Sequence, residues 1–102
     1  MPGFVKLASL DEVPPGAAIE VEHDGRVYAI FNVEGTIHVM DGICPHQGGP
    51  LAEGEVVDCV VTCPWHGWQF DIRTGQGLLS SRVKQPVFPV RIEGRDVLVE
   101  VP

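Results

Sequence analysis

The chain has 102 residues, which is enough for one domain with a modest core and too few for two such domains. Its formal net charge of −7 argues against nucleic acid and anionic membrane surfaces as partners. No stretch approaches the roughly 20 apolar residues of a membrane span, and the N-terminus lacks the layout of a secretory signal. We therefore expect a cytoplasmic protein that does not bind membranes.

The composition predicts short strands joined by turns, because 44% of the residues are hydrophobic and the chain contains 12 Gly and 9 Pro. A single helical turn is expected at residues 10–13, where Pro14 and Pro15 would end it. Strands at 18–22 and 26–31 flank Asp24-Gly25, which is a strong hairpin sequence. A third strand at 36–40 follows Glu34-Gly35 and extends the meander.

The second half continues the same pattern. The apolar run 56–62 predicts one buried strand, with Cys59 acting as a small core residue. Strands at 87–92 and 97–101 should pair across residues 93–96, and Pro89 predicts that the first of them is irregular or lies at an edge. His38 alternates with apolar neighbours and is expected to face solvent.

Two short motifs stand out between these strands. Cys44-Pro-His46 and Cys63-Pro-Trp-His66 each contain one potential thiolate ligand and one potential imidazole ligand. A C-x-H…C-x-x-H pattern supplies the two Cys and two His that a Rieske-type [2Fe–2S] centre requires. Replacing two thiolates by neutral imidazoles makes the cluster less negative, which raises its reduction potential.

The residues around these motifs, CPHQGGPL and CPWHGWQFD, resemble those of small soluble Rieske ferredoxins. The resemblance implies one [2Fe–2S] cluster per chain, with one iron held by Cys44 and Cys63 and the other by His46 and His66. It also implies an all-β Rieske-type fold of three antiparallel sheets. We expect a single Rieske domain over residues 1–102, with a β-sandwich base and an inserted cluster-binding lobe at about 42–82.

Other segments agree with this resemblance. Gly48, Gly49 and Gly67 follow the expected ligands, where loops must bend tightly and let backbone N–H groups approach sulfur. The D-x-x-T-G sequence at 71–75 matches a segment of many Rieske proteins, and Lys84-Gln85-Pro86 lies where the family has a third loop that covers the cluster.

Two other interpretations of the four residues remain open. Zinc also binds Cys₂His₂ sites, although zinc fingers usually present Cys-Cys and His-His pairs, whereas each loop here is mixed. A disulfide between Cys44 and Cys63 would leave the two histidines unexplained.

Differences from the family pattern predict which subtype of Rieske protein the chain resembles. High-potential Rieske proteins carry an extra disulfide-forming cysteine in each loop, and this chain has Gly49 and Trp65 at those positions. Trp68 and Phe70 occupy the positions of a Ser and a Tyr whose hydroxyls bond to sulfur in that group. Fewer hydrogen bonds to sulfur predict a potential near the bottom of the Rieske range, at about −150 mV.

The resemblance implies an electron carrier and not an enzyme, passing electrons as a monomer from a flavin-containing reductase to a terminal oxygenase. An alternative is a small subunit of an NAD(P)H-dependent nitrite reductase. The second motif also resembles catalytic subunits of oxygenases, which need a further iron-binding domain. Residues 1–58 hold 2 basic and 10 acidic side chains (net −8), and residues 59–102 hold 5 basic and 4 acidic ones (net +1). This asymmetry either orients the carrier toward partners or only keeps it in solution.

Overall fold

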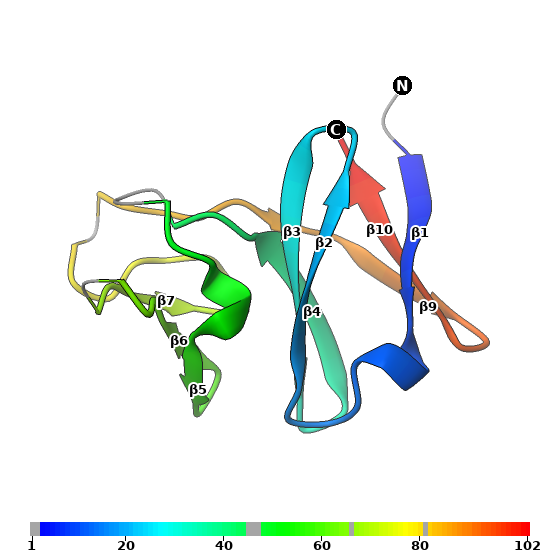
Figure 1. Ribbon diagram of the computed structural model, residues 1–102, viewed down its shortest axis with the longest axis horizontal. Coiled ribbons are helices and arrows are strands. Elements are labelled where there is room, and N and C mark those ends of the chain that lie inside the picture. The colour runs from blue at the N-terminus through cyan, green and yellow to red at the C-terminus, as the bar shows by residue number, and fades with distance from the viewer. Residues whose placement is uncertain (1–2, 45–47, 66, 81) are drawn as a thin grey trace.

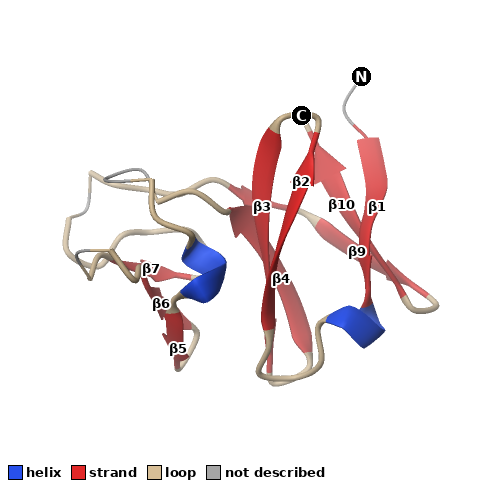
Figure 2. Cartoon of the chain, in the orientation of Figure 1, coloured by secondary structure: helices blue, strands red, loops and turns tan. Residues whose placement is uncertain are grey.

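The computed structural model describes residues 3–44, 48–65, 67–80 and 82–102. Within these residues the chain is built from strands and two 3₁₀ turns, with no α-helix (Figure 2). The strands are β1 Gly3–Ser9, β2 Ala18–His23, β3 Arg26–Val33, β4 Thr36–Asp41, β5 Glu55–Val57, β6 Val60–Thr62, β7 Gln69–Asp71, β8 Val87–Phe88, β9 Val90–Glu93 and β10 Asp96–Val101. The prediction of an all-β fold is confirmed.

The strands form three antiparallel sheets, as expected. Their orders are β1-β10-β9, β2-β3-β4-β8 and β5-β6-β7. Figure 1 shows that the first two sheets lie against each other and form the base, whereas the third lies to one side as a separate lobe. The lobe is inserted between β4 and β8, so both of its connections run to the same sheet.

The hairpins of the base follow from their turn residues. Asp24 and Gly25 have φ angles of 51° and 79°, and β2 pairs with β3 from the residues that flank them. Glu34 and Gly35 have φ angles of 52° and 92° between β3 and β4. Positive φ at both central residues is the requirement of a type I′ turn, whose twist matches that of paired strands.

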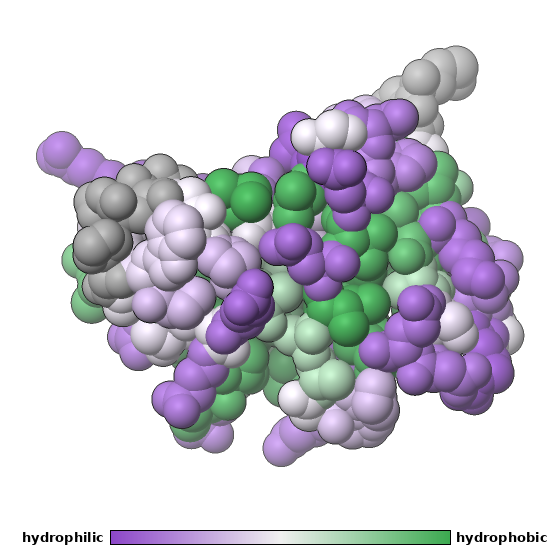
Figure 3. Space-filling view, viewed as in Figure 1, coloured by the Kyte–Doolittle hydropathy of each residue, from purple (hydrophilic) through white to green (hydrophobic). Residues whose placement is uncertain are grey.

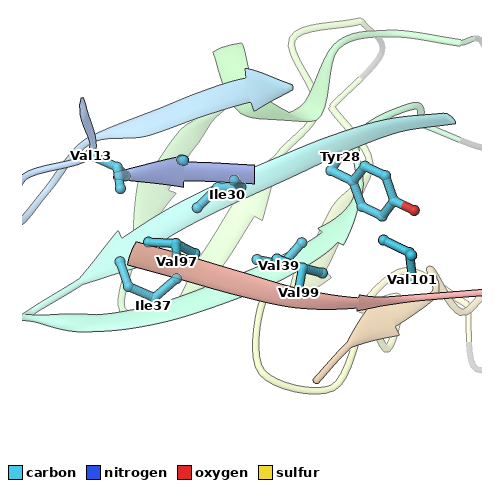
Figure 4. Packing of buried hydrophobic residues seen from close by; sticks show 9 residues of the cluster. Val13, Tyr28, Ile30, Ile37, Val39, Val97, Val99 and Val101 are labelled. Atoms are coloured by element: carbon cyan, nitrogen blue, oxygen red, sulfur yellow. The ribbon is translucent and has the colours of Figure 1, made fainter. Parts of the chain in front are cut away.

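The core of the base lies between its two sheets (Figure 4). Tyr28 and Ile30 of β3 pack with Val97 and Val99 of β10, and all four are at most 1% exposed. Each such apolar side chain contributes about 1.5–3 kcal/mol relative to an exposed position. The alternation of buried and less buried residues along β10 is the period of two that a half-buried strand requires.

A second core joins the lobe to the base. Ala29 and Phe31 point from the opposite face of β3, so this strand is buried on both faces. They pack with Leu51, Val61 and Phe70 of the lobe. The lobe is therefore fixed to the base by apolar contacts as well as by its two chain connections.

The expectation of one buried strand at 56–62 is wrong. The run folds back on itself as the β5–β6 hairpin, in which Val57 pairs with Val60. Asp58 and Cys59 form the turn with φ angles of 49° and 66°. The sequence Asp-Cys lacks the glycine that usually marks such a turn. Cys59 is partly buried against the second core, and Val57 is 57% exposed.

Pro89 marks the point at which the chain changes sheets. Before it, β8 pairs with β4; after it, β9 pairs with β10 in the other sheet. A proline cannot donate to a ladder, so a break between two strands is a position where it is tolerated. The expected irregularity at Pro89 is confirmed.

The helical pieces of the described chain are the 3₁₀ turns η1 Leu10–Glu12 and η2 Leu51–Glu53. In η1, the Ser9 side chain accepts a hydrogen bond from the Asp11 backbone, and the Glu12 side chain accepts one from the Ser9 backbone. This reciprocal capping fits the predicted helical turn. Neither piece is long and apolar enough to cross a membrane.

Candidate metal centre

The two predicted cysteine ligands come together at the end of the lobe. Cys44 lies three residues after β4, and Cys63 directly follows β6. Each is about 1% exposed. Burial raises the pKa of the Cys63 thiol, and the neighbouring Cys44 thiol raises it further. The two sulfur atoms are therefore close neighbours in a site that excludes water.

Each cysteine opens a tight loop closed by backbone hydrogen bonds. The Cys44 N–H donates to the Gly49 carbonyl over 2.8 Å, and the Gly48 N–H donates back to the Cys44 carbonyl over 2.8 Å. The Cys63 N–H donates to the Trp68 carbonyl over 2.7 Å. Gly48 and Gly67 have φ angles of 75° and 73°, where residues other than glycine are strained. The predicted role of these glycines as loop formers is confirmed.

Gly49 is required for a different reason, which is close packing. A Cβ atom at this position would stand 2.9 Å from Cys63 Sγ and 3.0 Å from Trp65 Cγ. Real Cβ atoms essentially never approach other atoms so closely. The first loop can therefore pack on the second only because Gly49 has no side chain.

The predicted third loop supports the first. The Gln85 side-chain amide donates to the carbonyl oxygens of Asp41, over 2.8 Å, and Ile43, over 2.6 Å. Gln85 is 2% exposed, and its own N–H donates to the Gly75 carbonyl over 2.7 Å. The Pro86 carbonyl accepts from the Asp41 N–H over 2.9 Å. This loop therefore fixes the backbone just ahead of Cys44.

The importance of Gln85 was missed by sequence reasoning, which placed the loop but gave its glutamine no role. Its partners lie 42 and 44 residues away in the chain. The only local indication was its place beside Pro86 in a segment assigned by family position. A buried amide whose donors satisfy buried carbonyls is expensive to remove, because the carbonyls then lose their partners.

His46 and His66, the predicted imidazole ligands, lie outside the described residues. Their placement as ligands of the second iron therefore stays a prediction. Among the residues that the structure describes, no group of three or more His, Cys, Asp and Glu side chains could hold a metal ion. No rival metal site is thus found in that part of the chain.

His38 does not face solvent as expected. It is half-buried, in a hollow lined also by Ile72 and Arg73 of the lobe and by Phe88 of β8. Burial lowers the pKa of His38, and the positive charge of Arg73 lowers it further, while Asp71 acts in the opposite direction. The position is at the contact between lobe and base, which the alternation along one strand could not reveal.

The cysteine geometry suits an iron–sulfur cluster. Thiolates are the soft ligands that such clusters use, and two of them converge in a buried site beside a glycine. Both thiols must lose their protons when metal binds. The raised pKa of Cys63 means that this thiol keeps its proton more readily while no metal is bound. These residues fit the cofactor that the sequence motifs predict.

A model of the Rieske [2Fe-2S] domain matches residues 3–92 of the chain. This chain belongs to the Rieske [2Fe-2S] family. Among curated relatives, the biphenyl dioxygenase ferredoxin subunit of Pseudomonas sp. (strain KKS102) is 45% identical and is matched over 95% of this chain and 91% of its own length.

Solved structures of other Rieske proteins agree. The Sphingomonas yanoikuyae B1 ferredoxin is 28% identical with a TM-score of 0.88, over 98% of this Rieske chain and 100% of that chain. A complex of reduced oxygenase and oxidised ferredoxin in carbazole 1,9a-dioxygenase contains a chain that is 28% identical, with a TM-score of 0.85, over 95% of this chain and 92% of that chain.

The cofactor follows from the family. The Rieske domain implies a Rieske-type [2Fe–2S] cluster, so the zinc interpretation is set aside. When bound, such a cluster supplies a one-electron redox step. The chain is thus of the ferredoxin kind found in dioxygenase systems, as predicted.

Proposed function

We propose that this Rieske protein carries single electrons from a flavin-containing reductase to a terminal oxygenase. The observation that carries the proposal is the pair of buried thiols at the end of the lobe, in two loops with the Rieske pattern. The relatives support it, because the similar curated proteins are ferredoxin components of oxygenase systems. A carrier needs its redox centre at an extremity, where two partners can reach it in turn.

The ligand set is part of the same proposal. Cys44 and Cys63 hold one iron, and His46 and His66 hold the other. The Gln85 amide positions the backbone ahead of Cys44, and Gly49 lets the second loop close on the first. These contacts hold the backbone ahead of Cys44 and the packing of Gly49 on Cys63 in place, which limits the rearrangement that each transfer requires.

We further propose that the chain works as a monomer in the cytoplasm and is not itself an enzyme. Its relatives among ferredoxin components are matched over most of their own length, which supports a carrier. Three free cysteines suit a reducing compartment.

The nitrite reductase alternative has weaker support. Small subunits assigned to such reductases share the fold with TM-scores of 0.86 and 0.89, but at 21% and 24% identity. That likeness concerns the fold alone. Three curated relatives at 30%, 34% and 45% identity are ferredoxin components of oxygenase systems instead.

The decisive experiment is reconstitution. Purified protein is mixed anaerobically with NADH and with the reductase and terminal oxygenase of a biphenyl dioxygenase system, to which the 45% identical relative belongs, and reduction of the oxygenase is followed. We expect fast reduction only with the cluster-loaded protein. His46→Ala and His66→Ala should each abolish the paramagnetic resonance signal of the dithionite-reduced cluster, whereas His23→Ala should keep it. A chain that holds iron but reduces no oxygenase would contradict the proposal.

A further inference from the structure

A loop at the end of the lobe exposes two consecutive leucines. Leu78 is 51% exposed and Leu79 is 65% exposed, the second being the most exposed of the large apolar side chains among the described residues. Figure 1 shows residues 78–80, in yellow, at the end of the lobe farthest from the base. The Leu78 N–H is hydrogen-bonded to Gln69, whose neighbour Trp68 accepts from the Cys63 N–H. Single exposed apolar residues are ordinary, but an adjacent pair beside a redox site marks a candidate contact surface.

The loop is braced rather than loose. The Gly77 N–H donates to the Val83 carbonyl over 2.8 Å, which closes the loop at its base, and the Leu78 N–H donates to the Gln69 carbonyl over 3.0 Å. The Val83 N–H donates to the Ser80 carbonyl over 3.3 Å. A Cβ on Gly77 would stand 2.8 Å from the Val83 carbonyl oxygen, so the two ends of the loop are packed too closely for a side chain at this position. The leucines are therefore held outward at little entropic cost to binding.

Two cations stand next to the leucines. Arg82 and Lys84 are exposed, and neither side chain has an ion-pair partner among the residues that the structure describes. Of the nearby charged groups, Arg73 is already paired with Asp71 over 3.1 Å. In a chain of net charge −7, this end of the lobe is thus locally positive. Figure 3 shows that hydrophilic side chains also line the right-hand edge of the base.

We infer that the leucine loop, defined as the described residues 77–80 and 82–84, docks on a partner surface with an apolar centre and a rim of carboxylates. The two leucines fill the apolar centre, and Arg82 and Lys84 face the carboxylates. The partner is the terminal oxygenase, so this inference rests on the proposed function. Complementary charge at a contact raises the association rate, and buried apolar anchors lower the dissociation rate.

The first test removes the apolar anchors. Leu78→Ser/Leu79→Ser is compared with Val57→Ser/Ile92→Ser, a control at two aliphatic residues that are 57% and 44% exposed elsewhere. Binding of each protein to the immobilised terminal oxygenase of a biphenyl dioxygenase system is measured by interferometry. We expect the leucine variant to weaken binding by about 10- to 100-fold and the control by less than about twofold. Equal loss in both variants would overturn the inference.

The second test reverses the charge of the two exposed cations and compares association rates. Arg82→Glu/Lys84→Glu and Lys6→Glu/Arg91→Glu change the net charge equally, and the latter pair lies on β1 and β9 of the base. We expect the loop variant to associate about tenfold more slowly than the control at low salt, with the difference vanishing at high salt. Faster association of the loop variant would show that the partner surface is basic, which overturns the inference.

The results distinguish a wrong docking surface from a wrong proposed function, on which this inference rests. Visible and paramagnetic resonance spectra of the leucine variant and of both controls should match those of the wild type, because none of them changes an expected ligand or the third loop. If the wild type reduces no oxygenase, the proposed acceptor is wrong. If the wild type reduces it and the leucine variant binds equally well, only the docking surface is wrong. Hydrogen exchange should slow in residues 77–84 on binding and remain unchanged in residues 90–93.

Discussion

Gly49 and Trp65 lie directly against each other across the two cysteine loops, since a Cβ placed on Gly49 would stand 3.1 Å from Trp65 Cβ. Disulfides join Cβ atoms about 3.5–4.5 Å apart. The positions at which high-potential Rieske proteins carry an extra disulfide are therefore in contact here too. Steric packing of an indole on a glycine has taken the place of a covalent link.

Gly49→Ala should disrupt this packing. The new methyl group would collide with the buried Cys63 Sγ and with the half-exposed Trp65. We expect a destabilisation of about 1–3 kcal/mol, as for other overpacked sites, and less iron bound per chain. Urea unfolding and iron analysis measure these effects. Gly3→Ala is the control, because nothing lies within 4 Å of a Cβ at Gly3; an equal loss there would remove the packing argument.

Gln85→Glu should loosen the first cysteine loop. The substitution keeps the shape but replaces the amide donor by an acceptor that faces the carbonyls of Asp41 and Ile43. Two buried carbonyls would lose their partners, at about 1–3 kcal/mol each. The free energy of unfolding should fall by at least about 2 kcal/mol. Gln69→Glu is the control, since Gln69 makes a longer, partly buried hydrogen bond of 3.3 Å to Thr62.

The midpoint potential should lie near the lower end of the Rieske range, at about −150 mV. Trp68 and Phe70 occupy the positions of hydroxyl-bearing residues in high-potential relatives, and neither can donate an O–H to sulfur. Phe70 is fully buried among the apolar residues of the lobe. Redox titration monitored by visible absorption measures the value, and a strongly positive midpoint would refute the assignment.

The same midpoint should be almost independent of pH near neutrality. A cluster that withdraws little electron density leaves its imidazole ligands weakly acidic, so no proton accompanies the electron. Titrations at pH 6, 7 and 8 are sufficient. A potential that falls steadily over this interval would show that a ligand proton is lost on oxidation.

His38 should make stability depend on pH. Its pKa in the folded protein lies below the ordinary value of 6.5, so the unfolded chain binds more protons in that interval. The stabilisation is complete above about pH 6.5 and declines as the pH falls toward the lowered pKa. His38→Gln should flatten the unfolding free energy below about pH 6.5 relative to the wild type.

The sequence predicted the local structure of the base well. Asp24-Gly25 and Glu34-Gly35 determine their turns through positive φ, and Pro89 marks a break because it cannot donate a ladder hydrogen bond. The convergence of Cys44 and Cys63 was also predicted, because two motifs that bind the same cofactor must lie close together in the fold.

The remaining errors have physical causes. A turn at Asp58-Cys59 carries no glycine, so an unbroken apolar run suggested one strand. The half-buried position of His38 depends on where the lobe packs, which no single strand encodes. Gln85 bonds residues more than 40 positions away, and such contacts arise only from the complete fold.

The hydrogen bonds of Gln85 and Pro86 to residues 41 and 43 tie the entrance of the lobe to its exit. A segment tied at its two ends in this way can be exchanged as a unit, provided that the side chains that pack on Ala29 and Phe31 are kept. Grafting the corresponding segment of a relative with a different redox potential between these points should leave the ladders of the receiving β-sheets intact. Evolution could retune the chemistry by the same exchange, leaving the supporting framework untouched.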